Sequence, residues 1–213
     1  MTDSIKRALI VIDVQNEYVT GNLRIEYPAV EVSLHHIGQV MDAARAAGIP
    51  VVVVQNSTSP GSPIFARGSD GWALHPVVAS RPADHYVEKS LPSAFAGTDL
   101  ESWLREQGVD TLTVVGYMTH NCVDSTVKQA LHAGFAVEVL DDATGSVPYS
   151  NRAGLASAEM IHRTFMVVLQ SRFANVLETE DWLAALDGRQ PLPERESIYA
   201  SYQHARQMMA RMG

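Results

Sequence analysis

The only cysteine of this 213-residue chain, Cys122, stands where a nucleophile would be placed. The apolar, β-branched run 111–116 predicts a buried strand, and a helix is expected from about Cys122 to Ala133. At such a strand–turn–helix junction, the first N–H groups of the helix and the helix dipole favour a thiolate and can hold an oxyanion. The alternative is that a lone cysteine serves as a small buried apolar residue.

Two further segments place a charged residue at the end of a strand. Residues 8–12 are apolar on both faces, as in the centre of a parallel sheet, and Asp13 follows them. Lys89 ends the shorter predicted strand 85–89. The C-terminal ends of parallel strands meet at the edge where α/β sheets bind ligands, so we expect Asp13, Lys89 and Cys122 to converge there. Alternatively, Asp13 is a turn residue and Lys89 is solvated.

In chain order these segments resemble the isochorismatase-like cysteine hydrolases, over roughly residues 7–186. The resemblance implies a catalytic triad of Asp13, Lys89 and Cys122. It also implies a cis peptide bond between Tyr117 and Met118, which directs the N–H of Met118 at an oxyanion beside that of Cys122. The segments that carry it are Asp13-Val14-Gln15-Asn16, Lys89 with Ser93-Ala94-Phe95, Gly116-Tyr117-Met118-Thr119-His120-Asn121-Cys122-Val123, and Asp141-Asp142-Ala143-Thr144.

The implied chemistry is hydrolysis of a C–N bond in a small amide, ureide or carbamoyl compound. Asp13 would accept the thiol proton and later deliver it to the leaving nitrogen, while Lys89 would favour the thiolate and orient Asp13. A thioester on Cys122 would then be hydrolysed by water. His120 lies two residues before Cys122, so it is an alternative base; otherwise it is a polar turn residue, and the family pattern does not require it.

Two departures from branches of the family narrow the activity. Nicotinamidase-type members carry metal-binding Asp and His residues after the second strand, where this chain has Gln55-Asn56-Ser57, so no metal and no other cofactor is expected. The isochorismatase branch, which cleaves an ether, lacks the cysteine, so amide-type hydrolysis is favoured here. An isochorismatase-type ether hydrolase and a non-catalytic or redox thiol protein remain alternatives; no second cysteine is present to resolve an oxidised thiol.

Candidate residues of the substrate pocket are Asn16, Tyr18, Gln55, Phe65, Trp72, Phe95, Tyr117 and Tyr149.

Predicted strands and helices alternate along the chain. This alternation predicts an α/β fold, a three-layer α-β-α Rossmann-like arrangement with a mostly parallel sheet of about six strands. The stretch 56–71 is rich in Ser, Gly and Pro and lacks periodicity, which indicates a binding loop or lid. The predicted strands are 8–14, 50–55, 85–89, 111–116, 136–141 and 173–177, and the predicted helices are 30–47, 98–107, 122–133, 157–170 and 179–186.

Composition and charge fit one enzyme domain, which we place at residues 1–188. The chain is 46% hydrophobic with a net charge of −8, so neither nucleic acid nor a membrane is expected as a partner, and a small-molecule substrate is. No signal peptide or membrane-spanning run is recognised, so a cytoplasmic location is expected by elimination.

A C-terminal helical extension, residues 189–213, follows a Pro-containing break in composition. Its predicted helix, 194–212, either folds back on its own domain or packs on a neighbouring subunit. Because an apolar stripe along this helix would otherwise be exposed, we expect a homo-oligomer, either a homodimer or a homotetramer. The apolar stripe of the helix consists of Ile198, Tyr202, Ala205, Met208, Met209 and Met212.

Overall fold

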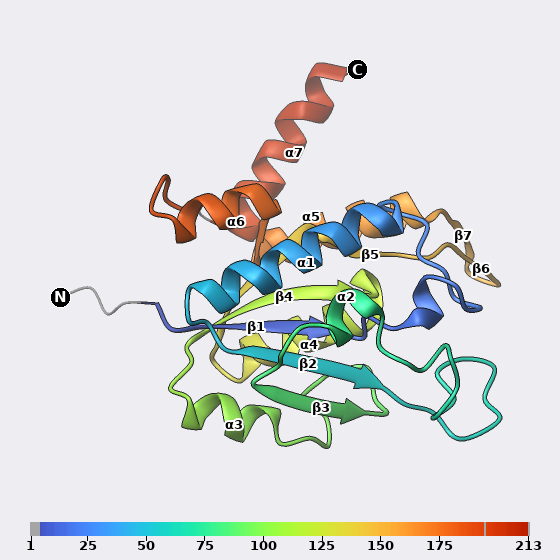
Figure 1. Cartoon of the computed structure of the whole chain (residues 1–213). Coiled ribbons are helices and arrows are strands. Elements are labelled where there is room, and N and C mark those ends of the chain that lie inside the picture. Colours follow the sequence, from blue (N-terminus) through green and yellow to red (C-terminus); the bar gives the residue numbers. More distant parts are fainter. Residues whose placement is uncertain (1–4, 194, 213) are drawn as a thin grey trace.

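The computed structural model describes residues 5–193 and 195–212, without the side chain of Met212. Its centre is a six-stranded parallel sheet with the strand order β3-β2-β1-β4-β5-β8 (Figure 1). This confirms the predicted α/β fold and its parallel sheet. The strands are β1 (Arg7–Ile12), β2 (Val51–Asn56), β3 (His85–Lys89), β4 (Thr111–Tyr117), β5 (Ala136–Gly145) and β8 (Asn175–Leu177).

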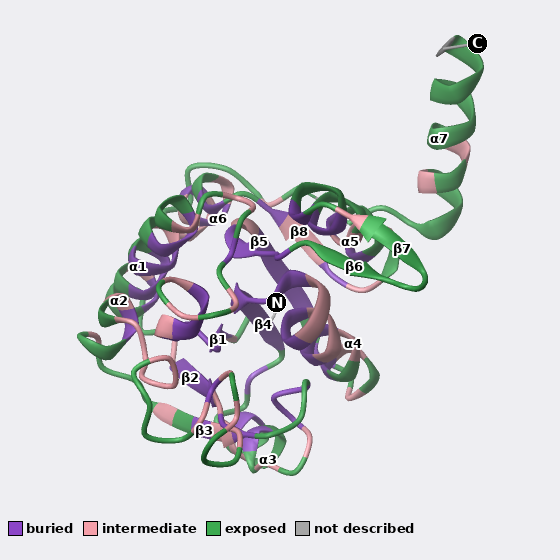
Figure 2. Ribbon diagram, turned by 90° about the vertical axis from the view of Figure 1, so that its right-hand side faces the viewer, coloured by how far each residue is buried: buried purple, intermediate pink, exposed green. Residues whose placement is uncertain are grey.

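Helices cover both faces of the sheet, which gives the three layers (Figures 1 and 2). Leu9 and Val11 of β1 face one layer, whereas Ile10 and Ile12 face the other, and all four are fully buried. Burial on both faces explains why this strand is a continuous apolar run. On the face of Leu9 lie α1 (Val30–Ala46), α2 (Pro76–Ala79) and α6 (Thr179–Leu186); on the face of Ile10 lie α3 (Leu100–Glu106), α4 (Asp124–His132) and α5 (Ala158–Arg172).

The structure differs from the predicted elements around the carboxyl ends of the strands. β5 continues to Gly145 instead of ending at residue 141, and an unpredicted antiparallel hairpin follows, formed by β6 (Tyr149–Asn151) and β7 (Gly154–Ala156). Cys122 lies in a π-helical turn, η2 (Thr119–Val123), so the α-helix predicted from Cys122 begins only at Asp124. A 3₁₀ turn, η1 (Asn16–Tyr18), follows β1.

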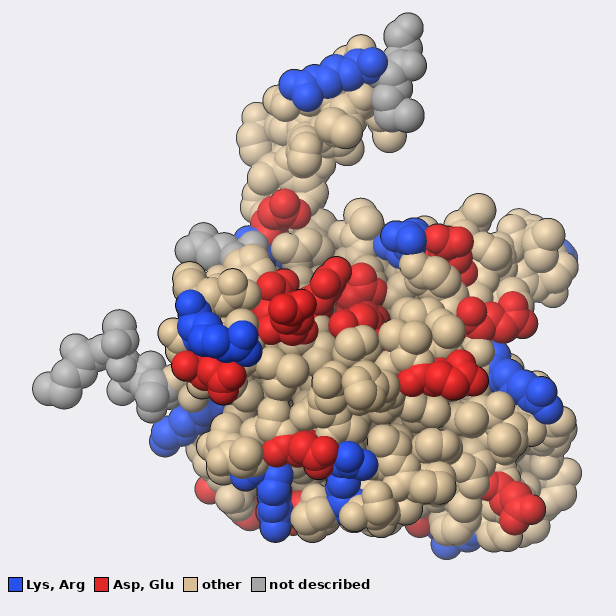
Figure 3. Space-filling model, turned by 45° about the horizontal axis from the view of Figure 1, so that its top comes forward, with Lys and Arg blue, Asp and Glu red and all other residues tan. Residues whose placement is uncertain are grey.

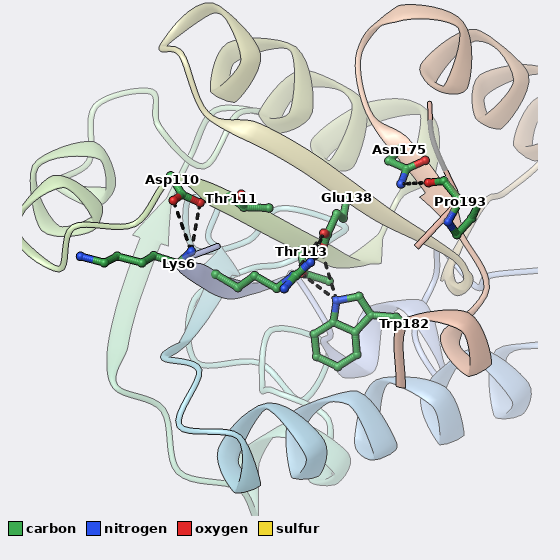
Figure 4. Close-up of polar contacts among 9 residues, drawn as sticks. Lys6, Asp110, Thr111, Thr113, Glu138, Asn175, Trp182 and Pro193 are labelled. Carbon is green, nitrogen blue, oxygen red and sulfur yellow. Dashed lines mark hydrogen bonds and ion pairs between the residues drawn. The ribbon is translucent and has the colours of Figure 1, made fainter. Parts of the chain in front are cut away.

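A buried carboxylate fixes the layers to one another in the half of the sheet away from Cys122. Glu138 of β5 forms an ion pair with Arg7 at 2.8 Å and accepts hydrogen bonds from Thr113 at 2.8 Å and Trp182 at 3.1 Å (Figure 4). These contacts join β1, β4, β5 and α6. A buried charge is costly unless it is paired and hydrogen-bonded, as this one is, so we assign the cluster to the scaffold.

The C-terminal helix α7 (Ile198–Met212) stands away from the body of the protein (Figures 1 and 2). It contacts α5, but Tyr199 is 73% exposed and Met209 66% exposed. The helix begins four residues later than predicted, and residues 194 and 213 of the predicted extension lie outside the described residues. Ile198, Tyr202 and Met208 of the apolar stripe are also exposed, so the described part of the stripe is not covered by its own domain. Among the described helices, none is long and apolar enough to cross a bilayer.

Candidate active site

Asp13 immediately follows β1, at the carboxyl edge of the sheet. Its backbone has a φ of +52°, in the left-handed region that Asp tolerates better than most residues. Its N–H donates a hydrogen bond to Val54 O at 2.9 Å, which ties this strained residue to β2. The side chain is not exposed. Unusual backbone geometry of this kind concentrates at functional sites.

Lys89, the last residue of β3, contacts both of the other residues of the predicted triad. Its Nζ lies 2.7 Å from Asp13 Oδ2 and donates a hydrogen bond to Cys122 Sγ at 3.3 Å. Nζ also donates to Asn56 Oδ1 at 3.4 Å. The structure thus brings Asp13, Lys89 and Cys122 together, as expected from their positions at strand ends. Asn56 was not among the candidate residues; it ends β2, which lies between β1 and β3.

Cys122 reaches this point because of the way β4 ends. Gly116 has a φ of +107°, and a Cβ atom there would lie 2.1 Å from Ile12 O, so only glycine fits where the pairing of β4 with β5 shifts register. The peptide bond between Tyr117 and Met118 is cis. Beyond it, the carbonyl of Cys122 accepts a hydrogen bond from Thr126 at 2.7 Å, and the cysteine is 6% exposed.

The electrostatics of the site keep the thiol protonated. Burial raises the pKa of Cys122 to about 12, and the charge of Asp13 adds to this increase, whereas Lys89 opposes it. The expectation of a lowered thiol pKa is therefore wrong for the unliganded site, because desolvation outweighs the cation. Burial also raises the pKa of Asp13 against the effect of Lys89. Burial opposes the charge of Lys89, but the negative charge of Asp13, together with that of Cys122 when it is ionised, outweighs this effect and raises the pKa of Lys89.

A buried network holds the turn that carries Cys122. Thr119, the first residue of η2, is hydrogen-bonded to His162 Nδ1 of α5 at 2.9 Å and to Thr144 at 3.2 Å. The other ring nitrogen of His162 contacts Asp141. His162 is 1% exposed and was not among the candidate residues. These bonds connect η2 to β5 and α5, so they position the cysteine without touching it.

Comparison with known proteins agrees with this geometry. The Isochorismatase domain, as a family model, matches residues 7–181. The chain belongs to the isochorismatase family. It is similar to a crystal structure of an isochorismatase-family protein from Burkholderia xenovorans LB400, with 66% identity, a TM-score of 0.95, and coverage of 97% of this chain and 99% of that one.

Two similar proteins carry names of amide-cleaving enzymes. The ureidoacrylate amidohydrolase RutB of Methylobacterium radiotolerans is 31% identical over 84% of this chain and 78% of its own length. The crystal structure of N-carbamoylsarcosine amidase from Thermoplasma acidophilum is 26% identical, with a TM-score of 0.68, over 83% of this chain and 98% of that one. The predicted resemblance is thus confirmed at the level of the family, and this chain is an isochorismatase-family hydrolase.

Two of the candidate pocket residues of this isochorismatase-family chain are tyrosines whose ionisation is coupled to that of Cys122. Tyr18 is 1% exposed, whereas Tyr149 is 41% exposed. The pKa of each phenol is raised, chiefly by burial, and an ionised Cys122 would raise it further.

Three candidates belong to the packed interior. The hydroxyl of Tyr117 is hydrogen-bonded to Ser33 of α1 at 2.6 Å, and its ring is fully buried, so it is a core residue and not a pocket residue. Phe95 packs against Phe135, with ring centroids 6.1 Å apart. Phe65 packs against Tyr18 at 5.1 Å and so supports a residue of the site.

The remaining candidates hold the loop between β2 and α2 against the body. Gln55 donates a hydrogen bond to the carbonyl of Trp72 at 2.7 Å, and the indole of Trp72 donates to Ser57 at 2.6 Å. Asn16 donates to the carbonyl of Asp70 at 3.2 Å. The stretch predicted to be a binding loop is therefore fastened by polar side chains at several points.

His120 is hydrogen-bonded to a serine and not to the thiol. Its Nδ1 is hydrogen-bonded to Ser146 at 3.1 Å. Burial, with a smaller contribution from His162, lowers its pKa to about 4, so the ring is neutral. Lys89, not His120, contacts Sγ. Among the described residues, no three His, Cys, Asp or Glu side chains gather in a way that could hold a metal ion; independence from metals stays a prediction.

Proposed function

We propose that this isochorismatase-family hydrolase cleaves the C–N bond of a small amide, ureide or carbamoyl compound, with Cys122 as its nucleophile. The observation that carries the proposal is the position of Lys89 Nζ, 2.7 Å from Asp13 Oδ2 and 3.3 Å from Cys122 Sγ, in a buried site. The names of the amidohydrolase and the amidase among its relatives support the reaction class.

Acylation begins from a neutral thiol beside an ion pair. As Sγ attacks the carbonyl carbon, its proton passes to Asp13, whose oxygens receive no well-aligned hydrogen bond from the described residues and so can accept it. The S–C bond forms while the carbonyl electrons move to oxygen. The N–H groups of Met118 and Cys122 are the proposed donors to that oxyanion. Lys89 stabilises the negative charge that sulfur acquires on losing its proton.

Collapse of the tetrahedral intermediate breaks the C–N bond, and Asp13 returns the proton to the leaving nitrogen. The product is a thioester on Cys122. Asp13 then accepts a proton from water, the hydroxide oxygen bonds to the acyl carbon, and the C–S bond breaks. The thiolate regains the proton from Asp13, so the site returns to its resting form and no cofactor is consumed.

Two other functions make different predictions about Cys122. An ether hydrolase of the isochorismatase type would use direct water attack or proton transfer and would not need the thiol. A redox protein would oxidise Cys122 and would need a thiol from another molecule to reduce it. The contacts of Sγ with Lys89 and the proximity of Asp13 favour the hydrolase, because only nucleophilic catalysis uses all three groups.

A substrate screen with matched variants tests the proposal. Small amides, ureides and carbamoyl compounds are assayed for release of ammonia or a carboxylate, with Cys122→Ser and Cys122→Ala beside a surface control, Ser171→Ala. We expect both Cys122 variants to lose activity, and Asp13→Asn to slow acylation by about 10²–10⁴-fold. Mass spectrometry of the quenched wild-type reaction should show an acyl adduct on Cys122. Substantial activity in Cys122→Ala would show that water attacks directly.

A further inference from the structure

A cavity lies beside the turn that carries Cys122. Its volume is about 390 Å³, within the range of small-molecule sites. It lies between the turn that carries Cys122, the hairpin β6–β7 and α5. The residues that form most of its wall are His120, Tyr149, Leu155, Ala156, Ile161 and Phe165.

One residue of the cavity wall belongs to the turn that carries the thiol. His120 lies in η2, two residues before Cys122, and its ring meets the ring of Tyr149 edge-on with centroids 4.9 Å apart. Both rings line the cavity. Because the cavity shares this turn with Cys122, a substrate held at Cys122 can extend a substituent toward it.

Apart from His120 and Asn151, the side chains that line the cavity are largely apolar, and none is an Asp, Glu, Lys or Arg. Leu155, Ala156 and Ile161 supply aliphatic surface, and Phe165 lies 6.0 Å from the ring of His120. The ring of His120 is itself neutral at ordinary pH. One polar atom in this wall, His120 Nε2, is buried and has no hydrogen-bond partner among the described residues. Because this nitrogen has no accessible surface, it offers no polar contact to a ligand, and the surface that the cavity presents is apolar.

We infer that this cavity binds an uncharged aromatic or branched aliphatic substituent of the substrate. The inference rests on the proposed function and names its substrate class: neutral aryl or alkyl amides. Ureidoacrylate and N-carbamoylsarcosine, named for two relatives, each carry a carboxylate. A carboxylate in this cavity would lie against apolar walls without gaining a cation, so such substrates are disfavoured here.

Ligand binding to Cys122→Ser tests the cavity without requiring any reaction. The probes are acetanilide, which carries a phenyl group, and N-acetylglycine, which carries a carboxylate; their affinities are measured by ligand-observed NMR. We expect acetanilide to bind at least about tenfold more tightly, because burial of a phenyl group contributes that much. Ala156→Trp, which fills the cavity, should remove the preference, and Val167→Trp on the exposed side of α5 should retain it. Equal affinities for the two probes would overturn the inference.

Alkylation of the wild-type thiol separates this inference from the proposed function. N-phenyl and N-methyl chloroacetamide both form an S–C bond to Cys122 with loss of chloride, and their rates are normalised to those with glutathione. We expect the N-phenyl compound to react about tenfold faster, and Phe165→Ala to reduce that ratio. Reaction of both compounds at one normalised rate would contradict the cavity's role alone. A lack of amide hydrolysis together with a selective cavity would contradict the proposed function alone.

Discussion

Lys89 and Asp13 form an ion pair in which neither side chain is exposed, with Nζ and Oδ2 2.7 Å apart. Each charge has lost its water, so each depends on the other. Burial raises the pKa of Asp13, and Lys89 limits this increase. The charged surface of the molecule, in contrast, consists of side chains that solvent screens (Figure 3). The pair thus links the stability of the fold to the chemistry of the site.

Replacing Lys89 with Met should destabilise the protein by about 3–5 kcal/mol near pH 7, because Asp13 would remain buried and unpaired. Without the cation, the pKa of Asp13 rises further above its unfolded value. A carboxyl with a raised folded pKa binds its proton more tightly when folded, so stability falls as pH increases toward that pKa. The loss of unfolding free energy in Lys89→Met, measured by urea unfolding, should therefore be smaller at pH 5 than at pH 8.

Two further variants provide the control for this experiment. The side chain of Lys128 is 34% exposed and forms an i,i+4 ion pair with Asp124. We expect Lys128→Met to lower the free energy of unfolding by less than about 1 kcal/mol. Combining Lys89→Met with Asp13→Asn should recover part of the stability, because no unpaired buried charge then remains at this site. Equal losses for Lys89→Met and Lys128→Met would show that the ion pair does not have this role.

The protonated thiol predicts an unusual pH dependence of alkylation. Because burial raises the pKa of Cys122 to about 12, the thiolate fraction should grow throughout the neutral range. The rate of alkylation by iodoacetamide should therefore increase steadily from pH 6 to pH 9 without levelling off. Asp13→Asn removes the negative charge that contributes to this pKa and should shift the rate profile to lower pH. A plateau with a midpoint near pH 7 in the wild type would indicate a thiolate resting state.

The convergence of Asp13, Lys89 and Cys122 could be predicted because all three follow strands that the sequence marks clearly. Parallel strands end at one edge, so the type of fold was sufficient to bring the residues together. The position of Asn56 could not be obtained in this way, because it depends on β2 lying between β1 and β3. Strand order is fixed by long-range packing, which a local pattern does not contain.

For a related reason, neither the pKa of Cys122 nor the elements that surround the site could be predicted from the sequence. A strand–turn–helix pattern indicates helix N–H groups near a cysteine, but the depth of burial decides the thiol pKa, and burial is a property of the whole fold. The hairpin β6–β7 is only three residues long on each side, too short for a periodic signal. His162 lies within a helix whose pattern does not distinguish a buried polar residue from an exposed one.

The hydrogen bond between Thr119 and His162 should affect catalysis through position alone. Thr119→Val keeps the shape of the side chain but leaves His162 Nδ1 without its partner at 2.9 Å. We expect a loss of about 1–3 kcal/mol in stability and a lower kcat with little change in KM, because the turn that carries Cys122 is less well held. Thr119→Ser retains the hydroxyl and should restore kcat. A KM effect without a kcat effect would assign Thr119 to substrate binding.

We propose that α7 packs on a second copy of this chain, in a homodimer or homotetramer. Its exposed apolar residues include Tyr199, Tyr202 and Met209, and α5 beside it exposes Val167. The described part of α7 carries Arg206 and Arg211 but no acidic residue, whereas the chain as a whole has a net charge of −8. Figure 3 shows acidic side chains gathered on the body below this helix, so a second copy offers complementary charge.

The related Burkholderia structure also argues that α7 is a fixed part of the fold. The match covers 97% of this chain, so it includes most of the 15 residues of α7. Light scattering at micromolar concentration should give a mass of at least two chains. Truncation after Leu186 should reduce this mass, as should Met209→Glu, which places a charge in the apolar contact. Glu101→Gln in α3, on the opposite side of the molecule, should not reduce it (Figure 1). A single-chain mass for the full-length protein would show that α7 remains exposed and that the assembly does not form.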